Sequence, residues 1–411
     1  MILAGSVGGC MDFQLSAEDK REGAGASAES DVDADTDTDT DTDTDTDSDT
    51  DSDTDTDSDT DADTDADTDA DTGGDTGGDT GPAPEPVETV TGAVNAVFAD
   101  LAISHDGARL YATRVFENDL LVVDTATMTE LTTVALGGAP EAVRLSVDGT
   151  RALVALNDSP GRLAIVDVDP SSATVYTVLS TVSLSGNGSL GLGVHPDGDV
   201  VVGLTQNPDA GLLNLVDLGS STVSSTLAPT ASGSSPILYD AVFLSDGSKG
   251  YVSVFQSTGS SNVFPFTVDP AALSSGIDLA LPYEGGGPGA MVMVETAADT
   301  TLWVTNNSWG TDGLTVVDTA TDAVSVAFDL GGGGGSIPGI CLRPDHSMVL
   351  VAAAGRPLMG FDTSTPAYTH ERTEVSDHMD CIVSPLDDFV YISTSSGDIL
   401  KVDLLNMAAV E

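Results

Sequence analysis

Residues 98–136 read FADLAISHDGARLYATRVFENDLLVVDTATMTELTTVAL, and this stretch decides the fold. It contains four short runs that are apolar or alternate in polarity, namely FADLAIS, ARLYATR, LLVVDTATM and ELTTVAL, with turn residues between them. Short runs of this kind, bounded by turn residues, are typical of β-strands. The stretch therefore predicts one sheet of four consecutive strands.

The same two-part pattern occurs seven times along the chain. Each copy has a polar turn that carries an Asp, and about 18 residues later an apolar strand that ends in a second Asp. The turn residues are Asp106, Asp148, Asp197, Asp246, Asp299, Asp345 and Asp387, and the strand-ending ones are Asp124, Asp167, Asp217, Asp269, Asp318, Asp362 and Asp403. Successive copies lie 41 to 53 residues apart. This period, with several short strands per copy, predicts an all-β, seven-bladed β-propeller over residues 86–411.

Several copies resemble the YVTN-type propeller repeats of bacterial surface proteins. LLVVDTATMTELTTVALGGAP followed by EAVRLSVDGTRALVAL is similar to that repeat, and LTVVDTATDAVSVAFDLGG at 314–332 is similar again. The resemblance covers residues 86–411 and is strongest in repeats one, two and five. Repeat four departs most, with NVFPFTVDPAAL in place of the usual strand and turn, so its outer strand is left open. The resemblance implies a propeller scaffold and does not specify a ligand.

The two ends of the propeller sequence complement each other. Alignment of Asp403 with Asp124 ends the chain where the seventh blade should begin its outer strand. Residues 87–94, VETVTGAV, align with the outer strand LTTVAL and precede the first inner strand. We therefore expect residues 87–94 to pair beside the strand at 398–403 and close the ring, which protects an otherwise open sheet edge.

Ahead of the propeller lies an acidic segment of low complexity. Residues 31–72 alternate Asp with Thr, Ser or Ala almost without a break, and residues 31–79 contain 23 Asp residues. Asp is depleted in strands and charges this dense repel one another, so the segment cannot bury surface. We expect residues 11–85 to be a disordered tether. A built calcium loop needs a Gly and a closing Glu that the tract lacks, so we expect only diffuse cation binding there.

The N-terminal residues read MILAGSVGGC. The run from Val7 to Cys10 resembles the lipobox of bacterial lipoproteins, although the apolar run is short and no basic residue precedes it. We therefore interpret residues 1–10 as the remnant of a signal whose true start lies upstream, with Cys10 as the lipidated residue; the alternative is a chance run of small residues in a cytosolic chain. Met11 after the Cys, by the same resemblance, permits sorting to the outer membrane.

Charge and hydropathy limit the classes of binding partner and the mode of membrane attachment. The net charge is −55, and the propeller sequence is itself strongly acidic, with scattered basic residues. Such a surface repels nucleic acid and anionic lipid head groups. The sequence has no run of about 18 apolar residues, so we expect membrane attachment only through a lipid anchor. We expect the propeller to be monomeric and to lie in the bacterial cell envelope, exposed at the surface.

The cysteines and short motifs give little chemistry. Cys341 and Cys381 fall in the inner strands of blades six and seven, one register apart and hence on opposite strand faces; two buried free thiols are the favoured interpretation and a disulfide is the alternative. GNGSLG at 186–191 opens a strand, so we interpret it as a turn and not as a nucleotide site. His105 and His195 lie beside Asp-Gly turns, where capping outweighs catalysis.

One set of polar residues is harder to assign to structure alone. The first inner-strand positions of the seven blades are Asp100, Ala142, Gly191, Asp240, Ala290, Gly339 and Asp380. In a propeller these positions surround the mouth of the central channel. We expect one of two roles for Asp100, Asp240 and Asp380: each carboxylate accepts backbone N–H bonds from the next blade, or the three form a cation or polar-ligand site. Calcium is the cofactor that this second interpretation favours.

A second set of residues lies in loops around the same mouth. These residues are Glu117, Asp119, Asp158, Asp209, Trp309 and Asp312. Trp309 is the best aromatic anchor for a ligand, because a loop Trp has no obvious core to fill, and packing against a neighbouring loop is its structural alternative.

Two classes of function remain open from the sequence. The first is a non-catalytic binding or scaffold propeller, anchored at the surface, that captures a protein, glycan or cationic ligand on its loop face. The second is a lactonase-like hydrolase that uses channel-mouth carboxylates, with or without a divalent cation. We favour the binding class.

Overall fold

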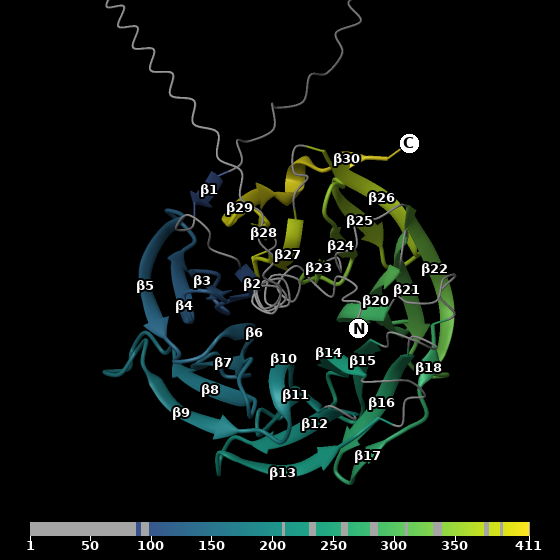
Figure 1. The fold of residues 1–411 in the computed structure, drawn as a ribbon. Coiled ribbons are helices and arrows are strands. Elements are labelled where there is room, and N and C mark those ends of the chain that lie inside the picture. Colours follow the sequence, from purple (N-terminus) through teal and green to yellow (C-terminus); the bar gives the residue numbers. More distant parts are fainter. Residues whose placement is uncertain are drawn as a thin grey trace, which may run out of the picture. The chain divides into compact units, whose positions relative to one another are not determined.

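The computed structural model describes residues 88–91, 98–207, 210–229, 236–255, 262–279, 287–308, 311–331, 339–373, 378–386 and 389–410. The predicted lipobox and the Asp-rich tract lie outside these residues. Within them, the strands form seven antiparallel sheets arranged in a ring around a common axis (Figure 1). The predicted all-β, seven-bladed propeller is therefore confirmed.

Blades one to three each have four strands. Blade one comprises β2 (Phe98–Ile103), β3 (Arg109–Arg114), β4 (Asp119–Asp124) and β5 (Thr129–Ala135). Blade two comprises β6 (Pro140–Leu145), β7 (Arg151–Leu156), β8 (Arg162–Asp167) and β9 (Val178–Ser183). Blade three comprises β10 (Asn187–Val194), β11 (Val200–Asn207), β12 (Ala210–Asp217) and β13 (Thr222–Leu227). In each blade the first strand is innermost (Figure 1).

Blades four to seven vary this plan at the outer edge. Blade four comprises β14 (Ile237–Phe243), β15 (Gly250–Phe255), β16 (Asn262–Val268), β17 (Ala271–Leu273) and β18 (Ile277–Asp278). Blade five comprises β19 (Gly287–Glu295), β20 (Thr300–Ser308), β21 (Thr311–Asp318) and β22 (Ala323–Gly331). Blade six comprises β23 (Gly339–Leu342), β24 (Met348–Ala352), β25 (Leu358–Asp362), β26 (Ala367–Arg372) and β30 (Ala408–Ala409). Blade seven comprises β27 (His378–Val383), β28 (Phe389–Thr394), β29 (Asp398–Asp403) and β1 (Glu88–Thr91).

The recurring Asp residues stabilise turns. Asp106 Oδ1 accepts hydrogen bonds from the Ala108 N–H at 3.0 Å and from the Ser104 hydroxyl at 2.6 Å. Gly107 follows with a φ of +69°, a left-handed conformation that favours glycine. Asp124 in turn accepts from the Thr127 N–H at 3.0 Å after β4. The repeated pattern thus marks turns that the Asp side chains hold closed.

The hydrophobic core lies between neighbouring blades. Leu120 and Val122 of blade one pack with Val154 and Leu156 of blade two in one buried cluster. Similar clusters lie between the other pairs of neighbouring blades. A fully buried Leu or Phe contributes roughly 1.5–3 kcal/mol. The outer strands contribute less, since β13 alternates between exposed and half-buried residues. The blades are therefore held mainly through their inner and middle strands.

The N-terminal strand completes blade seven. β1 pairs antiparallel with β29, with Glu88 opposite Lys401 and Thr91 opposite Asp398. This is the pairing that the sequence predicts for residues 87–94. The C-terminal residues continue past β29 through a short 3-10 turn, Leu404–Asn406, and β30 then pairs with β26 of blade six. β1 and β30 therefore complete the two neighbouring sheets of blades seven and six (Figure 1).

The outer strand of blade four, left open by the sequence, is divided into two pieces. β17 pairs with β16 at Phe266–Val268, and β18 pairs with β16 at Asn262 and Val263. Both short strands thus lie where the other blades have one continuous outer strand.

A disulfide joins blades six and seven. Cys341 of β23 and Cys381 of β27 are bonded, with their Cα atoms 5.7 Å apart. The expectation of two free thiols is therefore wrong. In a ring, blade six contacts blade seven with one face, and blade seven contacts blade six with the opposite face. Side chains one register apart on the two inner strands consequently point toward each other, so the opposite faces favour the bond.

Candidate functional site

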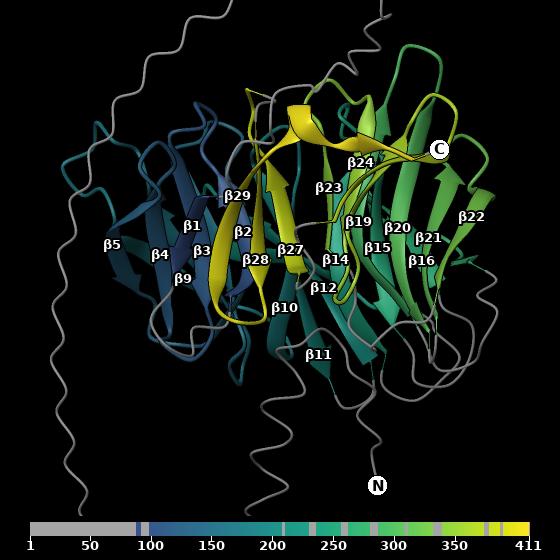
Figure 2. The same ribbon diagram turned by 90° about the horizontal axis from the view of Figure 1, so that it is seen from above.

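The seven aligned inner-strand positions line a central cavity of about 400 Å³. They are Asp100, Ala142, Gly191, Asp240, Ala290, Gly339 and Asp380. β27 points upward in Figure 2, so this strand begins toward the lower edge of the ring in that view. That edge bears the connections between second and third strands, which we call the loop face. The cavity thus includes the channel mouth expected from the sequence.

Small residues at this ring allow the blades to approach closely. A Cβ atom added at Gly191 would lie 2.0 Å from the Tyr239 carbonyl oxygen, and one added at Gly339 would lie 2.6 Å from the Asp380 Cα. Each glycine precedes a blade that carries a ring Asp. The small residues therefore leave room for the backbone that presents Asp240 and Asp380.

The three ring carboxylates connect neighbouring blades. Asp380 accepts from the Leu101 N–H at 3.1 Å, Asp100 from the Val143 N–H at 2.8 Å, and Asp240 from the Met291 N–H at 2.9 Å. In every case the donor belongs to the next blade. Each of the three Asp side chains therefore accepts a backbone N–H bond across a blade boundary, which is the structural role that the sequence analysis gave as one alternative.

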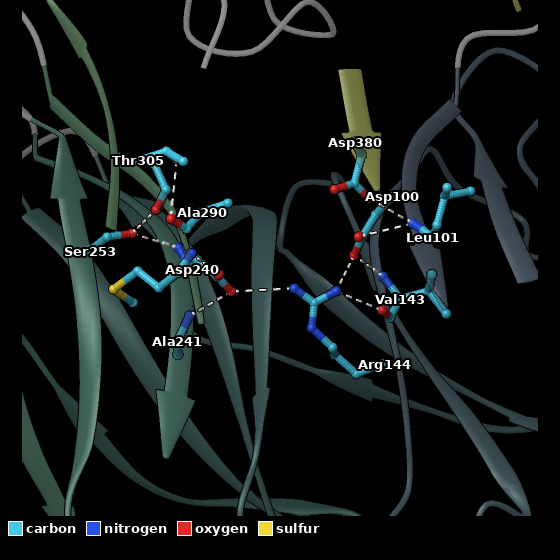
Figure 3. Close-up of polar contacts among 12 residues, drawn as sticks. Asp100, Leu101, Val143, Arg144, Asp240, Ala241, Ser253, Ala290, Thr305 and Asp380 are labelled. Atoms are coloured by element: carbon cyan, nitrogen blue, oxygen red, sulfur yellow. Dashed lines mark hydrogen bonds and ion pairs between the residues drawn. The ribbon is translucent and has the colours of Figure 1, made fainter. Parts of the chain in front are cut away.

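Arg144 of β6 places a positive charge among these carboxylates (Figure 3). Its guanidinium Nη1 lies 2.5 Å from Asp100 Oδ2, and Nη2 lies 3.4 Å from Asp240 Oδ1. The Arg144 side chain is 35% exposed to solvent, whereas the Asp240 side chain is 5% exposed. One cation thus links two carboxylates across the channel, and three carboxylates share it.

The charge balance of the cluster is reflected in its pKa values. Burial raises the pKa of Asp240 to about 6, against the opposing effect of Arg144. Burial, together with the charge of Asp100, raises the pKa of Asp380 well above its ordinary value. Burial disfavours the charged Arg144 guanidinium, but the carboxylates outweigh it and its pKa rises. The cluster therefore carries an excess of negative charge that burial makes costly.

The described residues contain no group of three His, Cys, Asp or Glu side chains arranged to hold a metal ion. Asp100, Asp240 and Asp380 surround Arg144 instead, so the guanidinium supplies a cationic charge within the ring. The expected cation site at Asp100, Asp240 and Asp380, with calcium as its ion, stays a prediction.

Glu141 is an additional acid in the cavity wall. It precedes Ala142 on β6, is 9% exposed and lines the cavity. Asn157 donates a hydrogen bond to Glu141 Oε1 at 2.9 Å. Burial raises the pKa of Glu141 to about 7, and the Asn157 bond only partly opposes this. Burial therefore disfavours the ionised form of this carboxyl.

Two of the expected loop carboxylates are paired within their own loops. Asp119 forms a bidentate pair with Arg114, with contacts of 2.6 and 2.7 Å. Asp158 lies 2.5 Å from an Arg162 nitrogen. Each of these two carboxylates is therefore paired with an Arg of its own loop. These acids do not join the central cluster.

The remaining expected rim residues differ in their surroundings. Glu117 Oε2 is buried without a hydrogen-bond partner. Asp312 of β21 is 4% exposed, its Oδ1 also lacks a hydrogen bond, and burial raises its pKa to about 6. Trp309 and Asp209 lie outside the described residues, as does Cys10. The role of Trp309 as an aromatic anchor thus stays a prediction.

Sequence reasoning missed Arg144, Glu141 and Asn157. Arg144 occupies a position two residues after the ring, where blades one, four and seven carry Ala102, Val242 and Ile382. A single Arg among apolar residues at one aligned position was a usable signal. Glu141 gave no comparable signal, because its importance depends on burial.

Comparisons with known proteins agree with the fold. No family model matches the chain, and no curated protein matches it. Hydrazine synthase from Kuenenia stuttgartiensis has a TM-score of 0.63 and 14% identity, covering 77% of this chain and 98% of that one. A chain from a crystal structure of the mitotic checkpoint complex has a TM-score of 0.60 and 14% identity, covering 78% and 91%. At such low identity, the likeness establishes the fold alone: the chain is a seven-bladed β-propeller protein.

Proposed function

We propose that this propeller is a non-catalytic binding module of the bacterial cell surface, related to the YVTN-type repeat proteins. Its loop face and channel mouth would capture a protein, glycan or cationic ligand, while Cys10 and residues 11–85 supply a lipid anchor and a tether. Pockets for ligands are commonly concave, partly apolar and equipped with few polar groups.

The charged floor of the cavity is the observation that carries this proposal. Asp100, Asp240 and Asp380 each accept a backbone hydrogen bond, and Arg144 is held between two of them. Groups fixed in this way present a constant electrostatic surface to a ligand. The neighbouring hydroxyls of Thr113 and Ser253 bond to backbone groups and not to a carboxylate oxygen, so no carboxylate is placed to activate them, which favours binding over covalent chemistry.

The disulfide supports a location outside the cytoplasm. Bonds between cysteines persist in oxidising compartments and are rare in the bacterial cytosol. Cys341 and Cys381 are bonded in the described fold. The lipobox resemblance, the acidic tether and the disulfide therefore agree with an anchored extracytoplasmic protein. Within the described residues, no helix is both long enough and apolar enough to span a bilayer.

Anchoring is tested by labelling cells with a radioactive fatty acid, using the chain with its upstream start restored. We expect label on the wild-type chain, loss of label in Cys10→Ser, and digestion of the propeller by protease added to intact cells. Label that persists in Cys10→Ser would exclude the lipobox interpretation.

Binding at the loop face is tested with two exposed apolar residues. Phe116 is 47% exposed in the loop before β4, and Leu386 is 66% exposed in a turn on the opposite face. Purified surface proteins and glycans are screened against the full chain, and each ligand found is measured again with both variants. A ligand that loses affinity with Phe116→Ala but not with Leu386→Ala supports the proposal; the reverse pattern contradicts it.

A lactonase-like hydrolase is the second candidate function. Glu141 favours it, because a carboxyl whose pKa is raised to about 7 can exchange a proton at neutral pH. Hydrolysis of lactones and aryl esters, measured with and without calcium, tests this function. Turnover that Glu141→Gln abolishes would favour the hydrolase, whereas an inactive wild-type chain would leave the binding proposal standing.

A further inference from the structure

The cavity combines a charged floor with apolar walls. Asp100, Arg144, Asp240 and Asp380 form the polar part. The lining also includes Leu190, Tyr239, Met379, Val242, Val292 and Ile382. A volume of about 400 Å³ lies within the usual range for sites that hold small organic molecules. The cavity is therefore large enough for a ligand that has both a charged head and an apolar body.

The charge in this cavity favours a cationic head group. Three carboxylates face one guanidinium on the floor, and Glu141 adds a fourth carboxyl from the wall. Asn157 is the hydrogen-bond donor to one Glu141 oxygen, and no described residue donates to the other oxygen. This second oxygen belongs to a side chain that is nine-tenths buried and lines the cavity. An anion would be repelled here, whereas an N–H donor of positive charge would satisfy the oxygen.

The same geometry disfavours a bare metal ion. Calcium needs six to eight oxygen ligands at about 2.3–2.6 Å. The carboxylates of the floor are already bonded to backbone N–H groups or to Arg144, and no described trio is arranged around a metal position. A primary ammonium needs only a few oxygen acceptors and tolerates their wider spacing.

We propose that the channel mouth binds an organic primary ammonium ion, with its ammonium group at Glu141 and its apolar body against Leu190, Tyr239 and Met379. This inference rests on the proposed binding function and specifies the ligand class of the channel mouth. Glu141, Leu190, Tyr239 and Met379 each lie one residue before the ring position of their blade, so they belong to one level of the channel. Tyr239 also lines this cavity, and an aromatic ring can attract a cation.

The test uses phenethylammonium chloride and its neutral isostere 2-phenylethanol with the full chain, by isothermal titration calorimetry at physiological ionic strength. We expect saturable, one-to-one binding of phenethylammonium and binding of the alcohol weaker by about tenfold or more, since only the cation gains a charge-assisted bond. Absence of saturable binding, or equal affinity for the two probes, would overturn the inference.

Two matched variants locate the binding. Glu141→Gln removes the wall charge and should weaken phenethylammonium binding by about tenfold. Glu130→Gln removes one charge at an exposed position of the outer strand β5 and should change affinity by less than about twofold. Both variants retain the acidic tract, so diffuse binding to it cancels in the comparison. An unchanged affinity in Glu141→Gln would refute the assignment.

Calcium distinguishes the inference from a hard-cation site. We expect 1 mM calcium chloride to leave the phenethylammonium affinity of the wild-type chain within about twofold of its calcium-free value. Competition by calcium that Glu141→Gln abolishes would show a metal site at this wall and overturn the inference. The proposed binding function is tested separately by comparing Phe116→Ala on the loop face with Leu386→Ala on the opposite face. Failure of the ammonium test would therefore not decide that comparison.

Discussion

Replacement of Glu141 by Gln should stabilise the protein at alkaline pH. Glu141 is 9% exposed, and Asn157 donates a hydrogen bond to its Oε1. Gln is nearly isosteric with Glu and retains a carbonyl oxygen that can accept the same bond. The substitution therefore removes the buried charge while the packing and the Asn157 contact are preserved.

The expected magnitude comes from the pKa of Glu141. Burial raises this pKa from 4.5 to about 7. Each pH unit between the unfolded and folded values is worth about 1.4 kcal/mol, so the difference corresponds to roughly 3 kcal/mol. Because the folded pKa is the higher one, the stabilising effect of the protonated carboxyl is fully present below pH 4.5. It is lost as the pH rises through about 7.

Urea denaturation of both chains at pH 4 and at pH 8 measures this effect. We expect the two free energies of unfolding to agree at pH 4, and the Glu141→Gln variant to be more stable by roughly 3 kcal/mol at pH 8. Glu130→Gln, at an exposed position of β5, serves as the control for loss of one surface charge. A stability difference between Glu141→Gln and wild type that is the same at both pH values would refute the reasoning.

Three further changes to the chain, one truncation and two sets of substitutions, test the ring. A chain that begins at residue 95 lacks β1 and loses the pairing with β29. Its free energy of unfolding should be lower than that of a chain that begins at residue 84 by about 2 kcal/mol or more, and it should melt at a lower temperature. Equal melting temperatures would contradict the closure. Cys341→Ala combined with Cys381→Ala should cost about 2–4 kcal/mol, measured against the oxidised wild type in urea, and reduction of the wild type should produce a similar loss. Gly191→Ala places a Cβ 2.0 Å from a carbonyl oxygen and should cost about 1–3 kcal/mol, whereas Gly219→Ala, with its nearest contact at 3.3 Å, should cost less in the same assay.

The sequence determined the fold well because the deciding signals are local. The turn residues Asp106, Asp148, Asp246 and Asp345 each accept a hydrogen bond from the backbone N–H two residues ahead. The strand runs between these turns are short and apolar, and the consecutive strands of each repeat pair side by side in one blade, whereas β1 and β30 join their blades through long-range pairing. The path after β29 gave no such signal, because β30 has only two residues and its partner belongs to blade six.

The disulfide shows how a correct local argument led to a wrong conclusion. The alignment placed Cys341 and Cys381 on opposite faces of equivalent strands, and the structure agrees with that placement by bonding them. The error was to compare the two strands as if they belonged to one flat sheet. Rotation from one blade to the next turns opposite faces toward each other, so equivalent strands of neighbouring blades must be compared across their interface.

The candidate site was only partly predictable for a related reason. The alignment identified the seven ring positions, since these depend on the backbone and its repeat. It did not identify Arg144, whose Cα lies at another level and whose long side chain reaches back to Asp100 and across to Asp240. A flexible side chain can thus change three carboxylates from a set of open metal ligands into a partly neutralised surface. In this protein, the presence of Arg144 among the carboxylates favours a larger organic cation over a hard metal ion. The chemistry of the channel mouth therefore depends on one residue that the repeat pattern does not require.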